Sequence, residues 1–210
     1  TEAMYRPIRK HPNAYNLGQQ GPDIFFYCPP SHIFYRTHLG GKMHSESTLA
    51  FFAALFEGRS RFVTKDAKMI CDSYIMGFMG HYTLDSTVHP YVHGRTRKEK
   101  LTGRMNYAFG IHVLLETDMD YAILKKYTHT KPCSFDAAGT ITLTKKEQAI
   151  ISILLSYAIR RTYPGIFTSP AHVSFAITCM RIANRFMIDP SGKKKSLVRF
   201  LDDLLIGNAF

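Results

Sequence analysis

The feature that most constrains the fold is an apolar stripe at helical spacing that ends in a histidine and an aspartate. Residues three and four apart from Ala67 to Phe78 lie on one side of a helix, and His81 and Asp85 continue that side. No Lys or Arg on the stripe offsets the carboxylate. An inward carboxylate costs several kcal/mol unless it is paired, protonated or bound to a metal. The pair therefore predicts a site for a divalent cation.

A second segment repeats this pattern. Over residues 101–123, apolar positions at helical spacing are interrupted by His112 and Glu116, which are again four residues apart. Two such pairs on apolar stripes are rarely a product of packing alone, so together they favour metal binding. Pro90 is expected to end or bend the first helix, which leaves His89 close to Asp85 as a further donor.

Composition predicts one globular domain, residues 1–210. The chain is 45% hydrophobic, has no low-complexity tract and is long enough to bury a core without disulfides. Residues 1–20 carry no helix-long pattern, so we expect an N-terminal helix to be missing ahead of them. Transmembrane and signal-peptide patterns are absent, which predicts a cytoplasmic protein. Four widely spaced cysteines without a C-x-x-C pair agree with a reducing compartment: Cys28, Cys71, Cys133 and Cys179.

The formal net charge of +11 favours anionic partners such as phosphate esters, nucleic acid or acidic lipid headgroups. Basic residues cluster at Arg6–Lys10, Arg95–Arg104 and Lys193–Lys195. A solvated charged face explains most clusters of this kind more simply than a binding groove does.

Capping and turn residues predict an all-α fold. Thr144 and Glu147 form a capping box ahead of one helix, and Ser169 followed by a proline starts another. Thr64 or Asp66 is expected to start the helix of the first stripe. The remaining expectations are a helix over 48–56 capped by Ser45 or Ser47 and stopped at Gly58, a loop over 95–100, a small hairpin within 128–143, and a final helix through Leu205.

The donors on these segments are too numerous for one tetrahedral site. A mixture of imidazoles and carboxylates suits zinc and also accepts manganese or iron. A cluster of two or three ions is the economical interpretation, with Asp85 as a bridge. For Asp23, capping a helix is the simpler alternative to metal binding. The predicted ligands are Asp23, His44, His81, Asp85, His89, His112 and Glu116.

Four segments, in this order, resemble the zinc-dependent phospholipase C family, whose relatives include zinc-dependent single-strand nucleases. They are residues 17–23 (Leu-Gly-Gln-Gln-Gly-Pro-Asp), residues 41–44 (Gly-Lys-Met-His), residues 81–91 with their His-x-x-x-Asp-x-x-x-His-Pro-Tyr pattern, and His112-x-x-x-Glu116. The resemblance spans about half of the chain. It implies a compact multi-helix bundle of the phospholipase C and zinc nuclease type.

The resemblance also implies how the ligands are divided. Asp23, His44, His81 and Asp85 would hold one ion, and His89, His112 and Glu116 another, with Asp85 bridging toward a third. In the family, an N-terminal amine or an early histidine holds that third ion. His11 is the nearest counterpart here, with a structural role as its alternative. The short spacing from Asp85 to His89 keeps His93 as a substitute ligand.

The activity implied is hydrolysis of a phosphoric ester by a zinc-activated water, on a phosphate-ester substrate such as a phospholipid headgroup at a membrane surface. By analogy with the family, Asp23 is the expected general base. One alternative is a nuclease or nucleotidase on single-stranded nucleic acid, although residues 95–104 lack the interleaved aromatics that stack bases. The other is a non-catalytic metal-binding helical protein.

Overall fold

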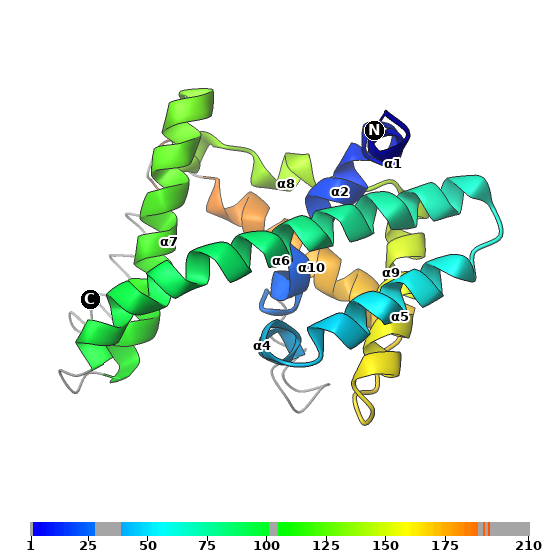
Figure 1. Cartoon of the computed structure of the whole chain (residues 1–210). Coiled ribbons are helices and arrows are strands. Elements are labelled where there is room, and N and C mark those ends of the chain that lie inside the picture. Colours follow the sequence, from blue (N-terminus) through cyan, green and yellow to red (C-terminus); the bar gives the residue numbers. More distant parts are fainter. Residues whose placement is uncertain (1, 28–38, 101–104, 189–190, 192, 194–210) are drawn as a thin grey trace. The chain divides into compact units, whose positions relative to one another are not determined.

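The computed structural model describes residues 2–27, 39–100, 105–188, 191 and 193, and every regular element among them is a helix (Figure 1). The all-α prediction is confirmed, and the final helix expected through Leu205 lies outside the described residues. The elements are α1 (Glu2–Lys10), α2 (Pro12–Gly18), the 3-10 helix η1 (Gly21–Phe25), α4 (Leu39–Ser45), α5 (Thr48–Ser60), α6 (Lys65–Lys100), α7 (Met105–Thr128), the 3-10 helix η2 (Pro132–Ser134), α8 (Ala137–Thr140), α9 (Lys145–Thr162) and α10 (Pro170–Met187).

The chain divides into two compact units. The first comprises Thr1–Ser86 and Ala138–Ala183, and the second comprises Thr87–Ala137 and Asn184–Phe210. Helix α6 contributes its N-terminal part to the first unit and its C-terminal part to the second. A single domain over residues 1–210 stays a prediction.

The core of the first unit lies where α5 packs against α9. Leu55 of α5 and Leu154 of α9 are fully buried there. The ring of Phe51 lies 5.3 Å from that of Phe78 on α6 and 6.2 Å from that of Tyr163. Phe78 is three residues before His81, so this aromatic packing holds α6 in place close to the histidine.

Helix α2 approaches α6 at two glycines, Gly18 and Gly77. A Cβ on Gly18 would lie 2.2 Å from the carbonyl oxygen of Tyr74, and one on Gly77 would lie 2.1 Å from that of Tyr15. Any larger residue at either position would separate the two backbones. This approach brings the end of α2, with the carbonyl of Gln19, against α6 near His81.

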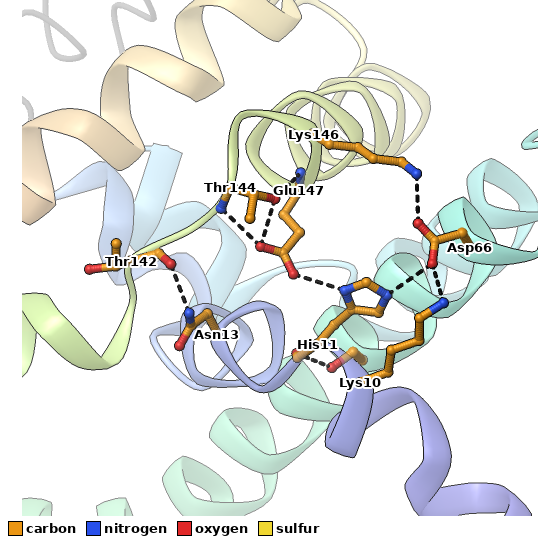
Figure 2. A network of polar contacts seen from close by, with 9 residues as sticks. Lys10, His11, Asn13, Asp66, Thr142, Thr144, Lys146 and Glu147 are labelled. Atoms are coloured by element: carbon orange, nitrogen blue, oxygen red, sulfur yellow. Dashed lines mark hydrogen bonds and ion pairs between the residues drawn. The ribbon is translucent and has the colours of Figure 1, made fainter.

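A polar network holds the N-termini of α2, α6 and α9 together (Figure 2). Nδ1 of His11 donates to Glu147 at 2.8 Å, and its Nε2 lies 3.4 Å from Asp66. Lys10 and Lys146 bind the Asp66 carboxylate at 2.5 and 2.6 Å, and their hydrogen bonds hold the pKa of that carboxyl well below its usual range.

His11 therefore has the structural role that was left open as its alternative, and it does not share an ion with Asp85. Its imidazole is buried between two carboxylates of the network. Asp66, which it contacts, is nineteen residues before Asp85 on α6, or about 28 Å at the rise of an α-helix. That separation is far too long for His11 and Asp85 to share a metal ion.

The predicted helix starts are confirmed at three positions. The Thr144 hydroxyl accepts from the Glu147 amide while the Glu147 carboxylate accepts from the Thr144 amide, which is the predicted capping box. Thr64 accepts from the amide of residue 67, and Ser169 accepts from that of residue 172. Ser47 precedes α5 without a side-chain cap, and α5 continues past Gly58 to Ser60.

Two local predictions are wrong, and Pro90 does not end its helix. Helix α6 continues through Pro90 to Lys100, so residues 95–100 are helical instead of a loop. A proline removes only its own bond to the preceding turn, and the helical sequence on both sides sustains the rest. The hairpin within 128–143 is replaced by η2 and α8. Asn13 and Asn16 of α2 donate to the carbonyls of residues 142 and 140, so these carbonyls need no partner strand.

Candidate metal centre

His44 and His81, on different helices, direct their Nε2 atoms toward each other. Nδ1 of His44 on α4 lies 2.8 Å from the carbonyl oxygen of Gly40, and Nδ1 of His81 on α6 lies 3.0 Å from that of Gln19. A carbonyl oxygen only accepts, so both Nδ1 atoms carry hydrogen and the neutral rings keep their lone pairs on Nε2. The two Nε2 atoms are 3.4 Å apart.

Two carboxylates complete this group. Oδ1 of Asp23 is 3.2 Å from Nε2 of His44, while Oδ2 of Asp85 is 3.2 Å from Nε2 of His81 and 3.6 Å from that of His44. One donor atom each from Asp23, His44 and His81 lies within 4.8 Å of the other two. Two nitrogen lone pairs and two carboxylates repel one another unless a cation lies among them, so this donor set fits zinc.

The group is buried on one side and open on the other. The His81 side chain is 10% exposed, whereas that of Asp23, on η1, is 40% exposed. Phe26 lies stacked against His44 with ring centroids 5.7 Å apart. Asp23 is therefore the donor that an incoming substrate could reach.

The carboxylates shift the titration of both imidazoles. Burial lowers the pKa of His44, but the hydrogen bonds with Asp23 and Gly40 and the charges of Asp23 and Asp85 outweigh it and raise the pKa. Burial likewise lowers the pKa of His81, and its contact with Asp85 and the charge of Asp23 raise it above its usual value. The centre therefore favours bound positive charge, whether protons or a metal ion.

A second group of predicted ligands lies in the second unit. Nε2 of His89 on α6 is 3.4 Å from Oε1 of Glu116 on α7, and the rings of His89 and His93 are 5.3 Å apart. The side chain of His112 lies outside the described residues. His89 and Glu116 are thus brought together as predicted donors, and their role as ligands stays a prediction.

Sequence reasoning gave no role to two residues at these sites, Gly21 and Asp120. Gly21 has φ 51°, in the left-handed region, and precedes Asp23 by two residues. Asp120 lies one helical turn after Glu116, and desolvation together with the Glu116 charge raises its pKa. The signal for Asp120 was visible as the continued spacing of four residues from His112 through Glu116.

Among the described residues, an all-helical scaffold that gathers an aspartate and two histidines in this way is the arrangement expected of a helical metal-binding protein. A comparison with protein families then identifies the family. The chain belongs to the zinc dependent phospholipase C family, whose model matches residues 1–169. The family predicted from the sequence motifs is therefore confirmed. Neither the curated proteins nor the solved structures gave a match.

Proposed function

We propose that this protein is a zinc-dependent hydrolase of phosphoric esters that acts at the centre formed by Asp23, His44, His81 and Asp85. The observation that carries the proposal is the 3.4 Å approach of the Nε2 atoms of His44 and His81, which hold the lone pairs of the neutral rings and are flanked by two carboxylates. Membership of the zinc dependent phospholipase C family supports zinc as the metal and hydrolysis as the reaction.

The chain's own residues prepare the centre for the metal. The carbonyls of Gly40 and Gln19 fix both ring tautomers, so no proton has to leave His44 or His81 when the neutral rings bind metal. Zinc, when bound, supplies a Lewis acid that neutralises phosphate oxygens and lowers the pKa of a water molecule. The carboxylates balance its charge.

Asp23 is the general base of the proposed reaction. Its side chain is the most exposed of the four, and one carboxylate oxygen is held 3.2 Å from Nε2 of His44. A carboxylate at the rim of the centre can orient a water molecule and take its proton as the oxygen attacks phosphorus, while the bond from phosphorus to the ester oxygen breaks and the alcohol leaves with that proton. Asp85 is more buried and contacts both imidazoles, so we assign it to metal binding.

A second ion is proposed at His89, His112 and Glu116. The 3.4 Å distance between His89 and Glu116 supports this part of the proposal. The expected substrate class is a phosphodiester or phosphomonoester, of which a phospholipid headgroup is one member. The net charge of +11 would attract such anions. Along the described residues, no helix combines the length and the apolarity needed to cross a bilayer.

Two substrates test the activity: a choline phospholipid and a short single-stranded oligonucleotide. We expect release of a phosphate ester from one of them, loss of turnover in chelator and recovery when zinc is restored. Turnover of the oligonucleotide alone would favour the nuclease alternative. A protein that holds zinc yet acts on neither substrate would favour the non-catalytic alternative.

The variant that tests the general base is Asp23→Asn, with Glu2→Gln as its control. Both exchanges remove one negative charge, and Glu2 is an exposed residue on α1. Loss of a general base lowers kcat by about 10²–10⁴-fold. Glu2→Gln is expected to leave kcat unchanged, and equal rates for the two variants would remove Asp23 from the mechanism.

A further inference from the structure

The first unit has a second concave surface that the metal centre does not explain. A cavity of about 390 Å³ is lined by basic residues of three helices: Arg6 of α1, Arg59 of α5, and Lys65 and Lys68 of α6. Its volume is in the range of sites that bind small molecules, roughly 300–1,000 Å³. Lys68 precedes His81 by thirteen residues on α6, or about 20 Å, so the cavity is separate from the metal centre.

The charge of this cavity is strongly unbalanced. Four cations line it with one carboxylate, Asp72, which leaves a net of three positive charges. Asp72 is already bound by Nε and Nη2 of Arg59 at 2.6 and 2.7 Å. Among the described residues, no carboxylate pairs with Arg6, Lys65 or Lys68. Cations held around one hollow repel each other, and a bound anion offsets this repulsion.

The neighbouring carboxylate, Asp66, does not offset the excess positive charge of the cavity. Asp66 follows Lys65 directly, but its carboxylate is bound by Lys10 and Lys146 (Figure 2). The ion pair with Asp72 also restrains Arg59, whose other guanidinium N–H groups remain as donors. The cavity therefore has a preorganised arginine beside two lysines and a second arginine.

We propose that this cavity binds a phosphomonoester group at a site distinct from the metal centre. Arginine offers planar paired donors to phosphate oxygens and lysine adds a compact charge, so this set of cations matches a phosphate dianion. Pro7, Val63 and Met69 line the same cavity and provide apolar contact for the carbon portion of the ligand. The phosphate belongs either to a soluble phosphomonoester or to a lipid headgroup.

The test titrates the zinc-loaded chain with inorganic phosphate and follows backbone amide resonances by NMR. Amides of residues 65–72 are expected to shift saturably and independently of those near His44. In Lys65→Ala/Lys68→Ala, the affinity reported by these amides should fall about tenfold or more, because two charge-assisted contacts are lost. The control Lys145→Ala/Arg160→Ala removes two exposed charges from α9 and should change that affinity by less than about twofold.

A second arm identifies the source of the phosphate by flotation with phosphatidylcholine vesicles, with and without phosphatidic acid. Loss of binding to phosphatidic acid vesicles only in Lys65→Ala/Lys68→Ala would assign the site to a lipid headgroup. Unchanged flotation, with phosphate binding in solution lost, would assign it to a soluble phosphomonoester. The proposal is overturned if residues 65–72 do not respond to phosphate, or if both double variants lose affinity equally. Neither outcome depends on hydrolysis at the metal centre.

Discussion

The imidazole of His81 occupies the space that a side chain on Gly21 would fill. A Cβ built on Gly21 would lie 2.2 Å from Cδ2 and 2.6 Å from Nε2 of His81, and φ at Gly21 is 51°. Only glycine meets both requirements without strain. The Gly-Pro-Asp turn and the histidine on α6 are therefore fitted to each other.

Gly21→Ala is accordingly expected to weaken metal binding. The methyl group would displace His81 from the Gln19 carbonyl, and loss of such an orienting bond costs about 10–100-fold in metal affinity. Competition with a fluorescent zinc chelator measures this change. Gly94→Ala is the control, because nothing lies within 4 Å of a Cβ there. Wild-type affinity in Gly21→Ala would contradict the proposed role of this turn.

Two glycines of α6, three residues apart, test the packing of α2. A Cβ on Gly77 would meet the backbone of α2 at 2.1 Å, whereas one on Gly80 has its nearest neighbour at 3.8 Å. Gly80→Ala should raise the free energy of unfolding by about 0.5–1 kcal/mol through helix propensity. Gly77→Ala should lower the free energy of unfolding, because the two backbones must separate. Thermal unfolding measures both, and equal shifts would show that α2 does not rest on Gly77.

The division of ligands between two ions predicts different metal losses for Asp85→Asn and Glu116→Gln. Asp85 contacts both His44 and His81, so its amide variant should weaken the ion of the first unit. Glu116→Gln should spare that ion and weaken the one beside His89. Elemental analysis after gel filtration gives the metal content of each variant. Full metal retention in Asp85→Asn would remove Asp85 from the ligand set, and equal losses would refute the division.

The capping box of α9 predicts how stability depends on pH. Burial raises the pKa of Glu147, but hydrogen bonds from Thr144 and His11 outweigh it and lower the pKa below its usual value. A carboxyl whose pKa is lower in the folded state stabilises the fold above its unfolded pKa. This contribution is lost as the pH falls through the folded pKa.

Glu147→Gln should therefore cost about 1 kcal/mol near neutral pH, typical of a helix cap. The difference from wild type should shrink below about pH 4, where the carboxyl of the unfolded chain takes up a proton. Urea unfolding across this pH range measures it. A difference that grows toward acid pH would contradict the assigned direction of the Glu147 shift.

The helices could be predicted from the sequence because their signals are local. The capping box at Thr144 and the apolar stripe before His81 each involve residues within a few turns. Sequence motifs predicted the family, and they predicted that Asp23, His44, His81 and Asp85 lie together. The network of His11 with Asp66 and Glu147 could not be predicted, because these residues are distant in sequence and only tertiary packing joins them. The continuation of α6 through Pro90 could not be predicted either, because it depends on the helical sequence on both sides of the proline.

The proposed metal centre is tested most directly by locating zinc in crystals of the zinc-loaded chain, using anomalous scattering at the zinc absorption edge. We predict a peak about 2.0–2.2 Å from Nε2 of His44, Nε2 of His81 and a carboxylate oxygen of Asp23. Such a peak would fix the ion among the donors that already lie within 4.8 Å of one another. Zinc bound elsewhere on the chain, with no peak among these three residues, would contradict the account.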